Sequence, residues 1–302
     1  MTDHSGLGRR AVALAISVGL LVSCSEGGPE ADPPAASPTS AAPDETGPAL
    51  PSVPATDDAT RLAGQLDRVA TTLRASGAPA ADVRRAAEFQ QLAVRALATS
   101  SPAFRRKVMG RLDRETARDT RADATAAQLL LSMLTEPAQE LPRWRIVPPP
   151  PAEELLGHYR RAQQRTGVHW SHFAAIHLVE TRMGRIRGVS TAGALGPMQF
   201  LPTTWDLYGA DGDIRDPGDA ILAAGRLLVA NRAPGDIAGA LWHYNPSDAY
   251  VGAVLSYART MRRTPAAYHR YFHWRVLYAH ERGTHVLPVG YPEKRPVLLP
   301  GG

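Results

Sequence analysis

A predicted helix that places a carboxyl group among apolar side chains lies in the middle of the chain. Residues 168–184 read VHWSHFAAIHLVETRMG, and Trp170, Phe173, His177 and Glu180 are spaced three, four and three positions apart. This spacing aligns the four side chains along one face of an α-helix. We therefore expect Glu180 to lie on the buried face of this helix, and Gly184 allows the helix to end.

Burial determines the chemistry available to Glu180. A carboxyl group removed from water is costly in its charged form, so its pKa rises and it can hold a proton near neutral pH. A general acid that cleaves a glycosidic bond needs this property. The alternative is a structural ion pair between Glu180 and Arg182, Arg185 or Arg187, and this segment alone does not separate the two interpretations.

The start of the chain predicts export. Arg9 and Arg10 precede the apolar run Ala11–Val22, which is shorter than the roughly 20 residues that a membrane-spanning helix needs. A positive start before a short apolar core is typical of a secretory signal peptide. Residues 21–24, LVSC, resemble a bacterial lipobox. We therefore expect a signal peptide over 1–23 and a lipid on Cys24 that anchors the protein outside the cytoplasm, facing the cell wall; a plain signal peptide or a signal anchor is the alternative.

Composition divides the region before the central helix into three parts. Residues 24–60 are rich in proline and contain no aromatic residue, which predicts a disordered tether with a reach on the order of 100 Å. Residues 61–136 are rich in Ala, Leu and Arg and predict three or four amphipathic helices of packing or spacer character. Prolines predict a linker or extended strap over 137–150, followed by a catalytic domain over 151–264.

A second motif follows the central helix. Residues 190–205 read STAGALGPMQFLPTTW. Gly193 and Gly196 allow the backbone to come close to a ligand or to the helix that carries Glu180. Residues 198–200, MQF, offer an apolar wall with one amide, which is a surface that suits a sugar. Pro202 can open a short helix that reaches Tyr208.

Together these motifs resemble those of a known enzyme family. E-T-x-x-G at 180–184, followed by S-x-x-G-A-x-G-x-M-Q-F-x-P-x-T-W at 190–205, is similar to the soluble lytic transglycosylases, and most closely to the membrane-bound lytic transglycosylase B group. The blocks DGDIRDPGDAI at 211–221 and LWHYNPSDAY at 241–250 agree in order and spacing. The resemblance covers about residues 150–260. It implies a mainly α protein whose catalytic domain is lysozyme-like.

The resemblance also implies roles for single residues. Glu180 matches the catalytic glutamate, which cleaves the MurNAc-β-1,4-GlcNAc bond of peptidoglycan and forms a 1,6-anhydro ring. The implied substrate-binding residues are Ser190, Met198, Gln199, Phe200, Tyr244, Asn245 and Tyr250. The chain departs from the family pattern at Thr181, at Arg182-Met183 and at Pro197, which bears on fine specificity. The expected partner is the glycan strands of peptidoglycan. We expect the protein to be a monomer and to need no cofactor.

Two other functions stay open. A muramidase hydrolyses the same bond, but ordinary glycosidases need a second carboxyl group about 5–9.5 Å from the first, and the motif blocks offer only Asp211 or Asp213 as an approaching acid. A noncatalytic wall-binding lipoprotein would keep the groove without needing a buried acid. Nucleic-acid binding is not expected, because the formal charge of +5 is diffuse and no recognition motif is present.

No metal site is expected. The ten histidines are dispersed and form no zinc-binding pattern. Asp211, Asp213 and Asp216 lack the spacing of a calcium loop, and Asp216 instead fits the N-cap of a helix whose first residue is Pro217. The remaining residues, 265–302, form a C-terminal extension in which 274–279 and 284–289 predict a short β-hairpin.

Overall fold

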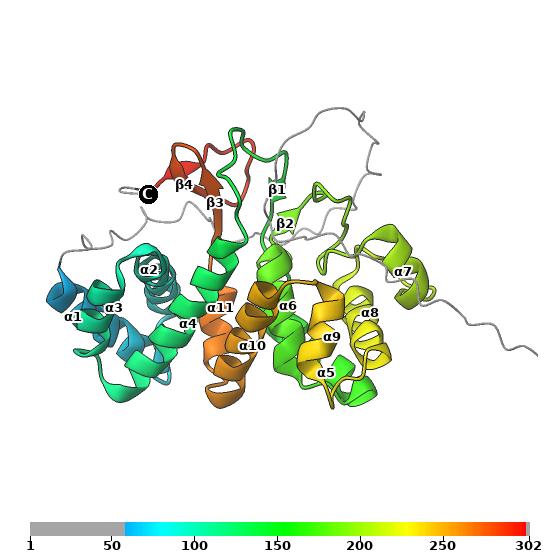
Figure 1. Ribbon diagram of the computed structural model, residues 1–302, viewed down its shortest axis with the longest axis horizontal. Coiled ribbons are helices and arrows are strands. Elements are labelled where there is room, and N and C mark those ends of the chain that lie inside the picture. Colours follow the sequence, from blue (N-terminus) through cyan, green and yellow to red (C-terminus); the bar gives the residue numbers. More distant parts are fainter. Residues whose placement is uncertain (1–57, 300–302) are drawn as a thin grey trace, which may run out of the picture.

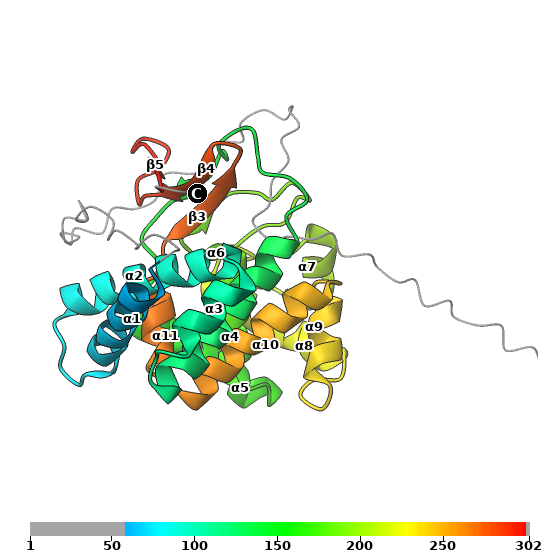
Figure 2. The same cartoon turned by 60° about the vertical axis from the view of Figure 1, so that its left-hand side comes forward.

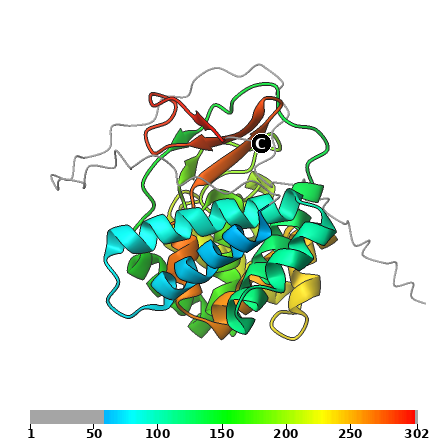
Figure 3. The same ribbon diagram turned by 90° about the vertical axis from the view of Figure 1, so that its left-hand side faces the viewer.

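Helices account for most of residues 58–299, which are the residues that the computed structural model describes (Figure 1). A small β layer lies on one side of the helical body, and two further directions of view show the same arrangement (Figure 2 and Figure 3). The predicted mainly α fold is confirmed. The predicted signal peptide, Cys24 and the tether up to residue 57 lie outside the described residues.

Four helices precede the strap in the part of the chain from residue 58 onward. They are α1 (Ala59–Arg74), α2 (Ala80–Thr99), α3 (Pro102–Met109) and α4 (Arg114–Ser132). Asp58 caps α1 by accepting a 2.9 Å hydrogen bond from the backbone N–H of Arg61, and Asp113 caps α4 in the same way. Helix α1 therefore begins inside the range predicted for the tether, because Asp58 supplies the cap.

These four helices share a core with the rest of the molecule. Helix α4 packs along α10 (Asp248–Arg263), and the two lie side by side in Figures 1 and 2. Val94 of α2 and Ala126 of α4 belong to the same buried cluster as the residues of the predicted catalytic domain. The helical segment 61–136 is therefore fused to that domain by packing.

A buried polar network reinforces this contact. Asp123 on α4 is fully buried and accepts hydrogen bonds from Gln90 (2.7 Å), from Arg270 (2.9 Å) and from the hydroxyl of Tyr271. Trp274 donates to the side-chain oxygen of Gln90 at 3.1 Å. The network ties α2 and α4 to the C-terminal extension.

Seven helices follow the strap. They are α5 (Ala152–Thr166), α6 (Trp170–Thr181), α7 (Pro202–Tyr208), α8 (Pro217–Ala230), α9 (Ile237–Tyr244), α10 and α11 (Ala267–Phe272). Asp216 caps α8 by accepting from the backbone N–H of Asp219 at 2.9 Å, as predicted. Helix α6 is central: α5, α8, α10 and α11 all pack against it. It is therefore buried on nearly every side, and the prediction of a single buried stripe was too narrow.

Short strands form the β layer. Strands β1 (Arg145–Ile146) and β2 (Ile186–Arg187) are antiparallel, and so are β3 (Val276–His280), β4 (Gly283–Leu287) and β5 (Val297–Leu298). The predicted hairpin is confirmed as β3–β4, while β5 was not predicted. The segment 137–150 is an ordered strap, since the backbone of Ile146 exchanges hydrogen bonds with Gly290 and Tyr291 at 2.8 and 3.0 Å.

Candidate active site

Glu180 lies in the last turn of α6, and its side chain is buried. Only 4% of the residue is exposed. The alternative prediction of an ion pair is not supported, because no arginine of residues 58–299 forms an ion pair with Glu180. Arg182 instead donates to the carbonyl of Leu178 at 2.9 Å, and Arg185 donates to the carbonyl of Phe272 at 2.9 Å. The carboxyl group is thus buried without a counterion.

Burial raises the pKa of Glu180 to about 8. A hydrogen bond from the hydroxyl of Tyr250 to Oε1, 2.7 Å long, opposes this shift because it stabilises the charged form. The other oxygen, Oε2, is buried and has no partner among the described residues. Glu180 is therefore protonated at neutral pH, and Oε2 is the oxygen free to present the proton.

Aromatic side chains form a packed wall behind Glu180. The rings of Tyr250 and Tyr244 are parallel within 4°, with centroids 6.4 Å apart. The hydroxyl of Tyr244 donates to the carbonyl of Met198 at 2.6 Å, and Phe200 meets Tyr244 edge to face. The structure thus brings four of the predicted substrate-binding residues together beside the acid. All four are buried, so they support the acid without presenting an open sugar-binding surface.

The other predicted substrate-binding residues have different surroundings. Ser190 closes the loop 190–194, since its Oγ accepts from the N–H of Ala194 at 2.9 Å. Gln199 donates to the carbonyl of Gly196 at 3.0 Å and has a positive φ of 50°. Asn245 is buried, and its Oδ1 has no partner among the described residues. Ser190 and Gln199 therefore shape the loop that follows the acid.

Two contacts hold that loop in place. A Cβ atom at Gly196 would lie 1.9 Å from the carbonyl oxygen of Ile214, so only glycine fits there. Thr181 donates from its hydroxyl to the carbonyl of Pro197 at 2.6 Å and accepts from the N–H of Gly184 at 3.1 Å. Thr181 and Pro197, two departures from the family pattern, thus hold the acid-bearing helix against the loop.

The third residue of the stripe, His177, is structural. Its side chain is fully buried, and Nδ1 makes a 2.8 Å hydrogen bond with the hydroxyl of Tyr159. Burial lowers the pKa of His177 to about 3, so the ring is neutral. It lies one helical turn before Glu180 and contributes no charge near it.

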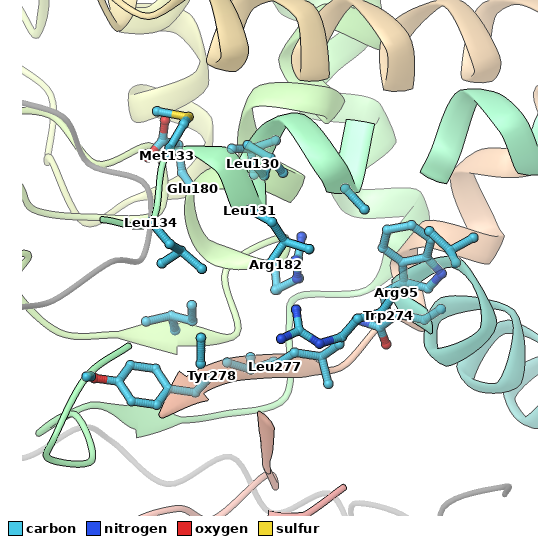
Figure 4. Close-up of a pocket in the computed structure, with 18 of the residues that line it drawn as sticks. Arg95, Leu130, Leu131, Met133, Leu134, Glu180, Arg182, Trp274, Leu277 and Tyr278 are labelled. Carbon is cyan, nitrogen blue, oxygen red and sulfur yellow. The ribbon is translucent and has the colours of Figure 1, made fainter. Parts of the chain in front are cut away.

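A cavity of about 330 Å³ opens beside Glu180 (Figure 4). Its walls come from α2, α4, the end of α6 and the hairpin strand β3. The lining residues that sequence reasoning missed include Arg95, Leu130, Met133, Trp274 and Tyr278. None of the seven predicted substrate-binding residues lines this cavity. Glu180 therefore separates the predicted aromatic wall from a cavity built largely by helices to which the sequence assigned no chemistry.

The backbone after Glu180 is strained. Arg182, Met183 and Gly184 all have positive φ values, of 53°, 59° and 85°, and the N–H of Met183 bonds to the carbonyl of His177 at 3.0 Å. Such values are costly for residues other than glycine. This turn ends α6 and places Arg182 among the residues that line the cavity. The glycine at 184 predicted the end of the helix, but the two strained residues before it gave no sequence signal.

Within residues 58–299, no three His, Cys, Asp or Glu side chains are grouped so as to hold a metal ion. Asp213 and Asp216 are engaged in turn and cap hydrogen bonds with backbone N–H groups. No helix in this part of the chain is long and apolar enough to cross a membrane.

Three comparisons with known proteins were made. Neither the family models, nor the curated proteins, nor the solved structures contain a match to this chain. The function is therefore inferred from the geometry of the site and from the sequence motifs around Glu180.

Proposed function

We propose that the protein is a lytic transglycosylase that cleaves the MurNAc-β-1,4-GlcNAc bond of peptidoglycan, with Glu180 as the acid and then the base. One observation carries the proposal: a carboxyl group that is buried without a counterion and hydrogen-bonded by Tyr250 lies at the edge of a cavity. The motifs around it resemble those of this enzyme family. A purely structural carboxyl group would be expected to have a charged partner in such a position.

In the first step, Glu180 gives its proton to the glycosidic oxygen. The bond from C1 of MurNAc to this oxygen breaks, and GlcNAc leaves with its hydroxyl restored. The N-acetyl oxygen of MurNAc stabilises the positive charge that develops at C1. The leaving oxygen must approach Oε2, so at least one side chain that covers this atom has to move when the substrate binds.

In the second step, the Glu180 carboxylate takes the proton from the 6-hydroxyl of the same MurNAc. O6 then bonds to C1 and closes the 1,6-anhydro ring, while Glu180 is returned to its protonated form. No water is consumed. A group whose pKa is about 8 suits both steps, because a pKa near neutral pH makes both its protonated and its deprotonated form accessible.

Tyr250 and the aromatic wall support these steps. The hydrogen bond from Tyr250 to Oε1 stabilises the carboxylate formed after the first step and fixes the orientation of the group. The ring of Tyr244 stacks on Tyr250, and its own hydroxyl is held by Met198. The acid is therefore preorganised on packed elements.

A hydrolytic muramidase is the second candidate, and one observation favours it. Glu136 lines the same cavity as Glu180 and is exposed. It is the one further carboxyl group among the described lining residues. If it serves as the second acid of a hydrolase, Glu136→Gln will abolish cleavage, whereas the transglycosylase mechanism predicts that this variant remains active.

Product analysis separates these functions. Purified peptidoglycan is digested with the full chain, and the masses of the soluble products are determined by mass spectrometry. We expect fragments that end in 1,6-anhydroMurNAc and that are absent with Glu180→Gln. Reducing ends about 18 Da heavier, the mass of one water, would identify a hydrolase. Pelleting with sacculi but no soluble product would identify a noncatalytic wall-binding protein.

Location is proposed on the sequence alone. A lipid on Cys24 would hold the protein at the outer face of the membrane, and residues 24–57 would give the enzyme reach towards the wall. Mass spectrometry of the N-terminal peptide tests this, since a diacylglyceryl group on Cys24 is expected, and a Cys24→Ala variant should leave the membrane fraction. An unmodified N-terminal peptide that begins elsewhere would contradict the anchor.

A further inference from the structure

Two arginine side chains reach into the cavity that contains Glu180. Arg95 comes from α2 and Arg182 from the turn after α6, and Figure 4 shows both in the space between the α4 residues and β3. Glu180 lies towards one end of the same cavity. Two cations and one neutral acid thus share a single cavity.

Neither arginine is neutralised by the protein. Within residues 58–299 neither forms an ion pair, and their hydrogen-bond partners are uncharged: Thr284 Oγ1 for Arg95 and the carbonyl of Leu178 for Arg182. The Arg182 guanidinium also lies 6.0 Å from the centroid of the Trp274 ring. A guanidinium has five N–H donors, so both groups keep donors that no protein acceptor uses.

The arrangement is costly without a ligand. Burial lowers the pKa of both arginines, and Arg182 lowers that of Arg95 further because the two positive charges repel each other. Most of the remaining lining is apolar, including Leu130, Leu131 and Val276, which weakens the screening of this repulsion. Two cations held close together on apolar walls repel each other, and an anion bound between them would offset this repulsion.

We propose that Arg95 and Arg182 form a subsite for a carboxylate of the substrate, so that the cavity selects glycans that carry this group. Guanidinium groups bind carboxylates through paired, charge-assisted hydrogen bonds. This inference rests on the proposed function and makes the substrate more specific, because only one of the two alternating sugars of the glycan carries a carboxyl group. The muramyl sugar carries a lactyl carboxyl group, free or linked to a peptide with carboxylates of its own, whereas N-acetylglucosamine carries none.

One described carboxyl group could compete for the arginines. Glu136 lines the cavity but forms no ion pair with Arg95 or Arg182. It is exposed near the end of α4 and remains hydrated there. A Glu136→Gln variant measures its contribution, and the proposal expects this variant to bind the anionic probes at least as tightly as the parent protein.

Binding, measured apart from cleavage, tests the subsite. The full chain with Glu180→Gln is titrated by calorimetry with three probes: chitobiose, the disaccharide GlcNAc-MurNAc with its free lactyl carboxylate, and the same disaccharide carrying a stem peptide. We expect at least one anionic probe to bind at least tenfold more tightly than chitobiose. Added Arg95→Gln or Arg182→Gln should remove that advantage and leave chitobiose binding unchanged.

Controls separate charge from folding. Arg160→Gln, an exposed arginine of α5 outside the cavity, should change no affinity. Arg95→Lys keeps the charge and should retain part of the advantage, and thermal unfolding checks each variant. An advantage seen only with the lactyl probe or only with the peptide probe identifies the source of the carboxylate.

The two proposals can fail separately. Equal affinity for all three probes, no binding of any probe, or an advantage that survives both arginine substitutions would overturn the carboxylate subsite, whatever the product analysis shows. Anionic binding that depends on the arginines, in a protein that releases no glycan products, would overturn the proposed cleavage and leave the subsite standing.

Discussion

The hydroxyl of Tyr250, in the first turn of α10, donates a 2.7 Å hydrogen bond to Oε1 of Glu180, in the last turn of α6. This bond is the one polar contact of the carboxyl group within the described residues, because Oε2 has none. It opposes the effect of burial on the pKa of Glu180 and holds one oxygen still. The orientation and the acidity of the proposed catalytic group thus depend on the same tyrosine.

Removal of this hydroxyl should change the pH profile. In Tyr250→Phe the ring can still stack on Tyr244, but the hydrogen bond that lowers the pKa of Glu180 is lost. The pKa therefore rises, and the alkaline limb of kcat/KM, where the acid loses its proton, should move to higher pH. Unfolding should become easier by about 1–3 kcal/mol, since Oε1 is left buried and unpaired. An unchanged alkaline limb would show that Glu180 is not the titrating acid.

Glu180→Gln should make stability less dependent on pH. The folded-state pKa of about 8 lies above the ordinary value of 4.5. Between these values the unfolded chain has lost the proton that the folded protein keeps, so the free energy of unfolding falls as pH rises from about 4.5 to 8 and then levels off. The full difference is on the order of 5 kcal/mol, because one pKa unit corresponds to about 1.4 kcal/mol. Chemical denaturation at several pH values measures it, and the glutamine variant should lack this component.

The same substitution should remove catalysis. A positioned general acid contributes roughly a factor of 100 to 10,000 to the rate, so Glu180→Gln should lose at least that much of its glycan-releasing activity. Binding to sacculi should persist, because the amide has nearly the same shape. Loss of sacculus binding in a variant with an unchanged melting temperature would instead assign Glu180 a role in binding.

Arg95 should lower stability in the absence of a ligand. Glutamine at this position can keep a hydrogen bond to Thr284 while it removes the repulsion with Arg182. We therefore expect Arg95→Gln to melt at the same temperature as the wild type or higher, although it binds anionic probes more weakly. A clear fall in melting temperature would show that the charge of Arg95 stabilises the fold.

Asp123 should prove essential to folding. Its carboxyl group is fully buried and accepts from Gln90, Arg270 and Tyr271. Asp123→Ala leaves the Arg270 charge without its buried partner, at a cost of about 3–5 kcal/mol. Denaturant unfolding measures this loss. The double variant Asp123→Leu, Arg270→Met should recover part of it, and a double variant that is less stable than both single variants would contradict this account.

Local spacing was sufficient to predict much of the molecule. Helix periodicity predicted several helices over residues 61–136, the cap at Asp216 predicted the start of α8, and the pattern over residues 274–289 predicted the hairpin, because these signals act over a few neighbouring residues. Glu180 was located for the same reason. The raised pKa of Glu180 also followed from its apolar neighbours, although the helix is buried on nearly every side and not along one stripe.

The far wall of the cavity could not be predicted. Arg95 and Leu130 belong to amphipathic helices whose faces look like ordinary packing surfaces in sequence, and they meet Glu180 only through long-range contacts among α2, α4, α6 and β3. For the aromatic wall, sequence identified the residues but not their burial. The resemblance implied substrate-binding roles for Tyr244 and Tyr250, and both lie beside Glu180, but sequence could not show that both would be buried behind it.

The division of the cavity between distant segments has a consequence for how its lining can change. Glu180 and Tyr250 lie within residues 170–250, whereas the cavity wall that faces Glu180 is contributed largely by α2, α4 and β3. Under the proposed function, substitutions on the lining faces of those helices can alter which glycan is accepted without disturbing Glu180 or Tyr250. Selection for a new wall composition can therefore act on α2 and α4 while Glu180 and Tyr250 are kept unchanged.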